Sequence, residues 1–121
     1  MADKKIGLVV THASDNPEMA TLPFILATGA MAMSVEPVMV LQGDGVRLAV
    51  AGGAEAANAE GLAPLSDLMA AVLGAGYRIM VCSPCIATRG ISEDELVDGC
   101  YVGGAGIVVQ AMLDCENFLR Y

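Results

Sequence analysis

The stretch RIMVCSPCIATRGI, residues 78–91, joins a predicted strand to a predicted helix through a C-x-x-C pair. A strand is expected over residues 77–81, because a short apolar run that ends at turn-forming residues is typical of a buried strand. Ser83 is expected to cap the next helix, with Pro84 at its first position. A strand that leads directly into a helix is half of a β-α-β unit, so this stretch predicts a parallel sheet.

The rest of the chain repeats the same alternation of strands and helices. Further strands are expected over residues 5–11, 37–42, 99–103 and 117–121, with helices in the intervening segments, including 65–73 and 105–115. The predicted fold class is therefore α/β: a three-layer α/β/α arrangement with a five-stranded, mostly parallel sheet, formed by a single domain over residues 1–121. Functional sites in such sheets gather beyond the carboxyl ends of the strands, where both Cys82 and His12 are expected.

The segment between Glu18 and Glu36 has no charged residue. Its length is at the short limit for a membrane helix, but Pro23 and several hydroxyl side chains interrupt it, so no membrane span is expected. Helical spacing predicts instead a helix with a buried face formed by Leu22, Ile25, Leu26, Gly29 and Met33. The opposite side is also apolar, which favours a helix that packs on the sheet and on a second surface.

Composition restricts the classes of partner. The net charge of −8, with six scattered Lys and Arg residues, argues against direct binding of nucleic acid. Hydrophobic residues make up 55% of a short chain, and such an excess is most easily buried between subunits, so we expect a homo-oligomer or a hetero-oligomer. The N-terminal residues lack the pattern of a secretory signal, and we expect a cytoplasmic protein whose four cysteines remain thiols.

The C-x-x-C pair of Cys82 and Cys85 admits several interpretations. At the start of a helix, the unpaired backbone N–H groups and the helix dipole favour a nucleophilic thiolate with a lowered pKa. A dithiol that forms a reversible disulfide fits the same strand-to-helix setting, although no later proline is available for a thioredoxin-like cis-proline loop. Two small buried side chains without chemistry are the remaining alternative.

Other motifs carry less chemistry. A zinc site would need two further ligands from His12, Cys100 and Cys115, whose spacing forms no second metal-binding pair, so neither a metal nor another cofactor is predicted. The glycines of VGGAGIVV, residues 102–109, do not form a dinucleotide-binding fingerprint and are interpreted as a tight turn with close helix packing. SEDE, residues 92–95, is interpreted as a capping box. Cys115 is expected in the core, and Cys100 is left without a role.

The segments VCSPCIATRGI and DGCYVGGAGIVVQAMLDCENFLRY, residues 81–91 and 98–121, resemble the DsrE/DsrF/TusD sulfur-relay family of small α/β proteins. The likeness extends to the strand IGLVVTH, residues 6–12, and to the turn GDGV, residues 43–46. It implies a DsrE/F-like domain that commonly assembles as a trimer or hexamer, or with homologous subunits, and that exchanges sulfur with donor and acceptor proteins.

The resemblance also implies roles for individual residues. Cys82 matches the cysteine that carries sulfane sulfur as a persulfide in the sulfur-relay members, which makes the protein a sulfurtransferase-type carrier. His12 is a candidate proton partner, and Ser83 and Arg89 are candidates to contact the substrate, with Arg89 alternatively stabilising the end of a helix. Cys85 departs from the family pattern, because many relatives have a small non-thiol residue there. A dithiol redox protein and a non-catalytic oligomeric subunit remain alternatives.

Overall fold

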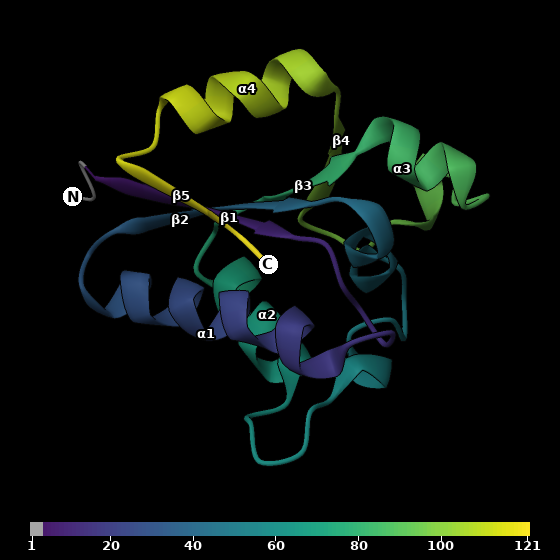
Figure 1. The fold of residues 1–121 in the computed structure, drawn as a ribbon, viewed down its shortest axis with the longest axis horizontal. Helices are drawn as coiled ribbons and strands as arrows, with labels where there is room; N and C mark the ends of the chain where they lie inside the picture. Colours follow the sequence, from purple (N-terminus) through teal and green to yellow (C-terminus); the bar gives the residue numbers. More distant parts are fainter. Residues whose placement is uncertain (1–3) are drawn as a thin grey trace.

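The computed structural model describes residues 4–121 and contains a five-stranded sheet between helices (Figure 1). The strands are β1 (Lys5–Val10), β2 (Glu36–Leu41), β3 (Ile79–Cys82), β4 (Cys100–Gly103) and β5 (Asn117–Arg120). Their order is β4-β3-β2-β1-β5, and all neighbouring pairs are parallel. All carboxyl ends therefore lie at one edge of the sheet, and the predicted α/β class with a five-stranded parallel sheet is confirmed.

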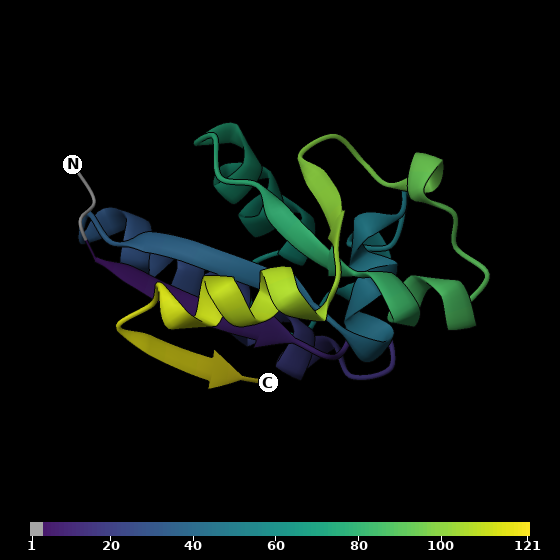
Figure 2. The ribbon, with the colours of Figure 1, turned by 90° about the horizontal axis from the view of Figure 1, so that it is seen from above.

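Helices cover both faces of the sheet. The α-helices are α1 (Pro17–Ala32), α2 (Leu65–Gly74), α3 (Ser83–Thr88) and α4 (Ala105–Leu113), and the short 3-10 helices are η1 (Gly43–Ala49), η2 (Glu55–Ala57) and η3 (Glu93–Glu95). α1 and α2 lie on one face and α4 on the other, whereas α3 and η1 lie beyond the carboxyl ends of the strands (Figures 1 and 2). None of these helices is long and apolar enough to cross a membrane.

The two faces of the sheet bury very different cores. Because side chains alternate along a strand, Leu8 and Val10 of β1 contribute to the main core, whereas Val9 faces α4. The main core lies on the α1 and α2 side and contains nineteen buried residues, with Phe24 completely enclosed. The second core comprises four buried residues, Val9, Val40, Met80 and Val108. The α4 side is thus the thinly covered face of the sheet.

Helix α1 begins as its sequence suggests but buries a different face from the predicted one. Asn16 caps it, since its side chain accepts a hydrogen bond from the Met19 N–H at 3.3 Å, and Pro17 takes the first position. The residues packed against the sheet and neighbouring elements are Ala20, Thr21, Pro23, Phe24, Ala27 and Ala30. The predicted stripe was wrong: Leu26 and Met33 are exposed. Both stripes have helical spacing, and the buried one combines small alanines with Phe24, which the main core encloses completely.

Short segments at the carboxyl edge are fixed by close backbone contacts. After β2 the chain forms the 3-10 helix η1, which packs against the end of β1 at Gly45. A Cβ atom on Gly45 would lie 2.1 Å from the carbonyl oxygen of Val10, so glycine is required for this approach. In η3 the predicted capping box is present, and the Glu95 carboxylate accepts the Ser92 N–H at 2.8 Å.

Two glycine substitutions test this packing in opposite directions. Gly45→Ala is expected to lower the free energy of unfolding by at least about 2 kcal/mol, since a backbone carbonyl cannot move away cheaply. Gly29→Ala, in the middle of α1 with open space around its Cβ position, is expected to raise the free energy of unfolding by about 0.5 to 1 kcal/mol. Urea unfolding followed by circular dichroism measures both, and equal midpoints for the two variants would contradict the close approach at Gly45.

Candidate functional site

Cys82 lies at the point where β3 becomes α3 without an intervening loop. It is the last residue of β3, paired in register with Gly103 of β4, and it is also the N-cap of α3. The prediction that Ser83 caps this helix was therefore wrong by one residue: Ser83 is the first helical residue and Pro84 the second. Sheet pairing extends as far as Cys82, so the chain turns into the helix at once and no free residue remains to act as a separate cap.

A cleft of about 480 Å³ opens beside Cys82, between α4 and the carboxyl edge of the sheet. Its lining is mostly apolar, with Gln42 and Arg120 as the charged or amide side chains. The lining residues are Val9, Gln42, Cys82, Pro84, Gly103, Gly104, Ala105, Val108, Val109, Met112, Phe118 and Arg120. The site therefore presents a thiol to a small, largely apolar space.

The glycines between β4 and α4 create room for this cleft. Gly103 ends β4 opposite Cys82, and Gly104 caps α4. A Cβ atom on Gly103 would lie 2.8 Å from the Cγ and Sδ atoms of Met80, so a larger residue would displace that side chain. The close packing predicted for this glycine segment is confirmed at Gly103, and it lets α4 begin directly beside the strand that carries Cys82.

Cys85 is adjacent to Cys82 through the first turn of α3. It occupies the third helical position, whose backbone N–H and side chain lie next to the N-cap side chain in any α-helix. Both cysteines are half-buried and pack against the main core, but only Cys82 of the two lines the cleft. The geometry thus brings the two thiols together while giving them different surroundings.

The electrostatic environment raises the pKa of Cys82. Burial is the largest cause, followed by a hydrogen bond with the Cys85 thiol, and together they outweigh the Cys85 N–H and the charge of Arg89, which lower the pKa. No helix-capping hydrogen bond to the Cys82 side chain is formed. The lowered pKa expected from the helix start was therefore wrong in direction, because partial burial and the neighbouring Cys85 thiol outweigh the effect of the start of the six-residue helix α3.

Arg89 stabilises the far end of α3. Its Nη1 donates to the Cys85 carbonyl oxygen at 3.2 Å, and its Nε donates to Oδ1 of Asp44 in η1 at 3.0 Å. Gly90 has a φ of 68°, and the Ile91 N–H returns to the Ile86 carbonyl oxygen at 3.0 Å, which closes a Schellman motif. The RGI sequence is thus explained by helix termination, as the alternative interpretation of Arg89 anticipated, while its charge still acts on Cys82.

His12 is held away from the cysteine pair. It follows β1, whereas Cys82 ends β3, and β2 lies between these two strands. The Nδ1 atom of His12 lies 2.7 Å from Oδ2 of Asp15, and the Ala13 N–H and this imidazole lower the pKa of Asp15. His12 does not line the cleft, so the structure does not bring this predicted proton partner to Cys82.

The remaining two cysteines, Cys100 and Cys115, are half-buried and lie outside the cleft. Cys100 begins β4 and packs on the main core, and burial raises its pKa to about 11. The predicted core position of Cys115 is wrong: it is half-buried and lies outside both cores, because α4 ends at Leu113 before reaching it. Its Sγ donates to the Ala111 carbonyl oxygen at 3.1 Å, and burial raises its pKa. Within residues 4–121 no three His, Cys, Asp or Glu side chains come together in a way that would hold a metal ion.

Sequence reasoning missed much of the cleft. Gln42 follows β2, Arg120 ends β5, and Phe118 and Met112 form walls, yet none of the four was singled out as a candidate. Gln42 and Arg120 occupy the ends of strands, which is the signal that the rule for parallel sheets provides. That rule shows which strand ends lie side by side only when the strand order is known, and the sequence alone does not reveal that β5 lies beside β1.

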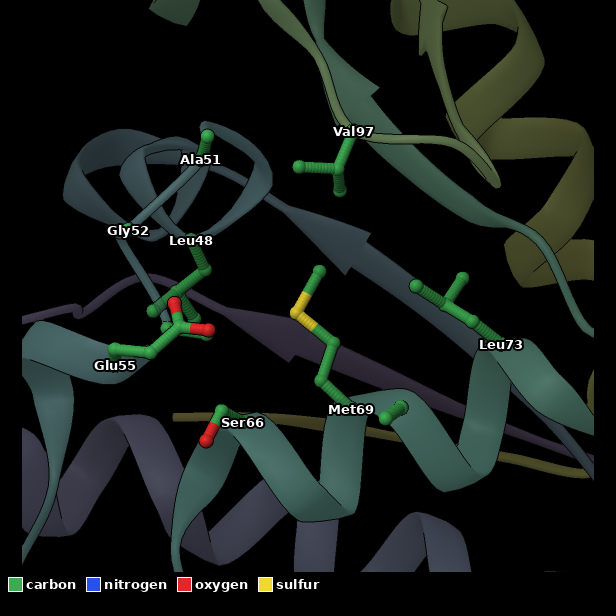
Figure 3. Close-up of a pocket in the computed structure, with 10 residues that line it drawn as sticks. Leu48, Ala51, Gly52, Glu55, Ser66, Met69, Leu73 and Val97 are labelled. Atoms are coloured by element: carbon green, nitrogen blue, oxygen red, sulfur yellow. The ribbon is translucent and has the colours of Figure 1, made fainter.

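A second pocket of about 310 Å³ lies on the opposite face, between η1, η2 and α2 (Figure 3). Glu55 and Ser66 are its polar side chains, and the thioether of Met69 projects into it (Figure 3). Its lining contains no cysteine or histidine. Of these two pockets, only the cleft beside Cys82 is lined by a thiol.

The fold and the thiol at the carboxyl edge define a small α/β protein with a cysteine site, and comparison with known proteins gives its family. The chain belongs to the DsrE/DsrF-like family, whose sequence model matches residues 4–121. The resemblance drawn from Cys82, Arg89, Gly90 and the glycine-opened last helix is confirmed.

Individual relatives are distant. The Uncharacterized protein MJ0760 of Methanocaldococcus jannaschii is 32% identical over 101 residues, which cover 84% of this chain and 37% of that protein. This chain therefore matches little more than a third of the length of that relative. The crystal structure of the ychN protein from E. coli superposes with a TM-score of 0.81 at 20% identity, over 98% of this chain and 99% of that one. MTH1491 of Methanobacterium thermoautotrophicum, a protein of unknown function, gives 0.74 at 18% identity, over 98% and 100%. At these identities the two structures show a shared fold.

The direction of the Cys82 pKa shift predicts the pH dependence of its alkylation. A raised pKa means that less thiolate exists at neutral pH, so the alkylation rate of Cys82 is expected to keep rising above the pH at which an ordinary cysteine levels off. Cys85→Ala removes the thiol hydrogen bond and is expected to move the Cys82 profile to lower pH. Iodoacetamide rates measured by peptide mass spectrometry test this, with Cys100→Ala as a control that leaves the profile in place. A Cys82 profile below that of free cysteine would refute the assigned environment.

Proposed function

We propose that this protein is a sulfur-relay carrier that holds sulfane sulfur as a persulfide on Cys82 and passes it to a partner protein. The observation that carries the proposal is the position of Cys82, a half-buried thiol that ends a central strand and opens into the cleft, in a chain of the DsrE/DsrF-like family. The proposal places the protein in the cytoplasm, where reduced cysteines persist.

The carrier cycle consists of two thiol exchanges. The Cys82 thiolate attacks the outer sulfur of a donor persulfide; the donor thiolate leaves with the electron pair of the broken S–S bond and takes up the proton that Cys82 lost. An acceptor thiolate later attacks the outer sulfur of the Cys82 persulfide and displaces the Cys82 thiolate. Neither exchange needs a metal, an electron acceptor or another cofactor, since one S–S bond forms as one breaks.

The raised pKa of Cys82 favours slow rather than rapid transfer of the carried sulfur to other thiols. A thiolate with a higher pKa is a poorer leaving group, which slows the transfer of the outer sulfur to stray thiols. The apolar side chains of Val109, Met112 and Phe118 form part of the cleft wall. The amide of Gln42 and the guanidinium of Arg120 are the groups in the lining that can donate hydrogen bonds to a persulfide anion.

The other predicted site residues, Ser83, Arg89 and His12, have different roles in the proposal. Ser83 adjoins Cys82 at the first position of α3 and is the candidate to contact an approaching donor. Arg89 acts at longer range, through its charge and through the helix end that it stabilises. We leave His12 out of the carrier cycle, because β2 separates its strand from that of Cys82 and its ring is paired with Asp15.

The exposed apolar side chains support assembly with a second subunit, as either a homo-oligomer or a hetero-oligomer. Five large hydrophobic side chains on α4 and β5 are exposed: Ile107, Val109, Met112, Leu113 and Leu119. Leu113 is 74% exposed, which is costly for a side chain of this size unless another surface covers it. Val109 and Met112 also line the cleft, so a subunit bound to α4 would form part of the surroundings of Cys82.

The persulfide proposal predicts a defined mass change. After incubation with a persulfide donor, the wild-type chain is expected to gain about 32 Da, the mass of one sulfur atom, and Cys82→Ser is expected to abolish the gain. Cys115→Ser is the matched control and should gain the same mass, because Cys115 lies outside the cleft. Intact-protein mass spectrometry with peptide mapping measures the adduct. If Cys82→Ser still gained the mass at the wild-type rate, the carrier residue would be misassigned.

A dithiol redox function is the second candidate, favoured by the contact between the Cys82 and Cys85 thiols. This redox function predicts that the chain loses two hydrogen atoms on mild oxidation and that the loss requires both cysteines. Neither cysteine would keep a stable sulfur adduct. The same mass measurement separates the two functions, since adduct formation in a Cys85→Ser chain belongs to the carrier alone.

Assembly is tested at the most exposed residue of α4. Leu113→Glu is expected to weaken subunit association by at least about tenfold, because a charge would be buried in the contact, with little effect on the fold of the subunit. Gln110→Glu on the same helix is the control for added charge on a polar position. Light scattering after size exclusion measures the assembly. A wild-type protein that is monomeric at all concentrations would contradict the proposed interface.

A further inference from the structure

We propose that Cys85 limits the lifetime of the persulfide on Cys82 by displacing its outer sulfur as hydrogen sulfide and closing a Cys82–Cys85 disulfide. The inference rests on the proposed function, because it concerns the fate of sulfur carried by Cys82. It assigns the protein a second output, sulfide release, that competes with delivery of sulfur to an acceptor.

The first observation is the position of the two thiols in one helical turn. Cys82 is the N-cap and Cys85 the third helical residue, two positions whose side chains each reach the backbone N–H of the other in a capping box, so both thiols lie in the same helical turn. The Cys85 thiol is close enough to Cys82 to raise the pKa of the latter. Both cysteines pack against the same main core, which holds their side chains in place. A thiol so close to an S–S bond reacts as if it were present at very high concentration.

The second observation is that the two cysteines face different surroundings. Cys82 lines the cleft, and the outer sulfur of a persulfide needs the open space that the cleft offers. Cys85 does not line the cleft and lies on the side of Cys82 toward α3 and the core. Thiol exchange requires the attacking sulfur, the attacked sulfur and the leaving sulfur to lie in line, and this arrangement favours attack by Cys85 on the inner sulfur.

The chemistry of the leaving group favours the same attack. Displacement at the inner sulfur expels hydrosulfide, whose conjugate acid is stronger than a cysteine thiol. Displacement at the outer sulfur would expel the Cys82 thiolate, a poor leaving group because burial raises its pKa. Exchange is faster with a leaving group of lower pKa, so Cys85 is expected to release sulfide rather than take over the sulfur.

The step is balanced without an external oxidant. The Cys85 thiolate supplies the electron pair of the new S–S bond and attacks the inner sulfur, which belongs to Cys82. The bond between the inner and outer sulfurs breaks, and the outer sulfur leaves with its electron pair as hydrosulfide. Hydrosulfide takes up the proton that Cys85 lost, so the products are one Cys82–Cys85 disulfide and one molecule of hydrogen sulfide. A dithiol reductant then supplies two electrons and two protons to restore both cysteines and complete a cycle.

Competition between the two reactions makes the disulfide a signal of unused sulfur. An acceptor thiol that reaches the outer sulfur through the cleft collects it before Cys85 reacts, and both cysteines stay reduced. When no acceptor binds, the sulfur is released and the disulfide leaves Cys82 unable to load again until it is reduced. The carrier would thus deliver sulfur only when an acceptor is bound, and after a release it would load again only once a reductant has restored both cysteines.

The test follows a loaded persulfide in the absence of any acceptor. The full-length chain is loaded with sodium tetrasulfide, desalted into anaerobic buffer without reductant, and sampled for intact mass and for sulfide trapped with monobromobimane. In the wild-type chain the species heavier by about 32 Da is expected to convert to one about 2 Da lighter than the reduced chain, with one sulfide per converted chain. In Cys85→Ser the persulfide is expected to last at least about tenfold longer.

The controls separate the two levels of the proposal. Cys100→Ser should behave as the wild type, since Cys100 packs on the main core outside the cleft, and Cys85→Ala should match Cys85→Ser. Equal persulfide lifetimes in the wild type and in both Cys85 variants would overturn the role of Cys85 while leaving the carrier function intact. Loss of 2 Da without sulfide would show direct oxidation and also overturn it. Failure of every chain to gain sulfur would overturn both proposals.

Discussion

The site depends on the position of β3 between β2 and β4, because its pairing with β4 continues to Cys82, the last residue before α3. Because Cys82 is bonded into the sheet opposite Gly103 and at the same time caps a helix, its backbone has no freedom to move. The strand fixes the position of the thiol, and the first helical turn fixes the position of Cys85. A dithiol assembled in this way needs no disulfide or metal to bring its two members together.

The uneven covering of the sheet gives this cysteine an opening. The side with α1 and α2 buries the large core and carries most of the stability of the fold, whereas α4 covers the other side with a small one. The glycines before α4 bring its start to Cys82 but leave the cleft between helix and sheet unfilled. The same helix exposes the hydrophobic side chains proposed for assembly, so the surface near the thiol is suited to meeting another protein.

The apolar surroundings of Cys82 have two opposite effects on its chemistry. Burial raises the pKa of the thiol and reduces the thiolate available at neutral pH, which slows loading. The same burial makes the Cys82 thiolate a poor leaving group, which slows loss of the carried sulfur. A catalyst that turns over quickly would need the opposite balance, with a lowered pKa. The environment found here suits a protein that passes its sulfur to a bound partner rather than to stray thiols.

The sequence alone determined the α/β class, the five strands, the capping box of Ser92 and Glu95 and the position of Cys82 at a carboxyl edge. These features follow from local signals, such as the apolar run IGLVV in residues 6–10 and the spacing of Ser92 and Glu95. Each depends on residues close together in the chain, where hydrogen bonding and periodicity act directly.

Only the tertiary structure decided which of these parts meet. The α1 stripe of Leu26 and Met33 had the same helical period as the buried stripe that includes Ala20, Phe24 and Ala27, and periodicity could not tell which of the two faces the sheet. The strand order placed β2 between His12 and Cys82 and brought the end of β5 into the cleft. The direction of the Cys82 pKa shift likewise followed chiefly from burial rather than from the start of its helix. Periodicity describes a segment by itself, whereas contact, burial and solvation depend on what the rest of the chain packs against it.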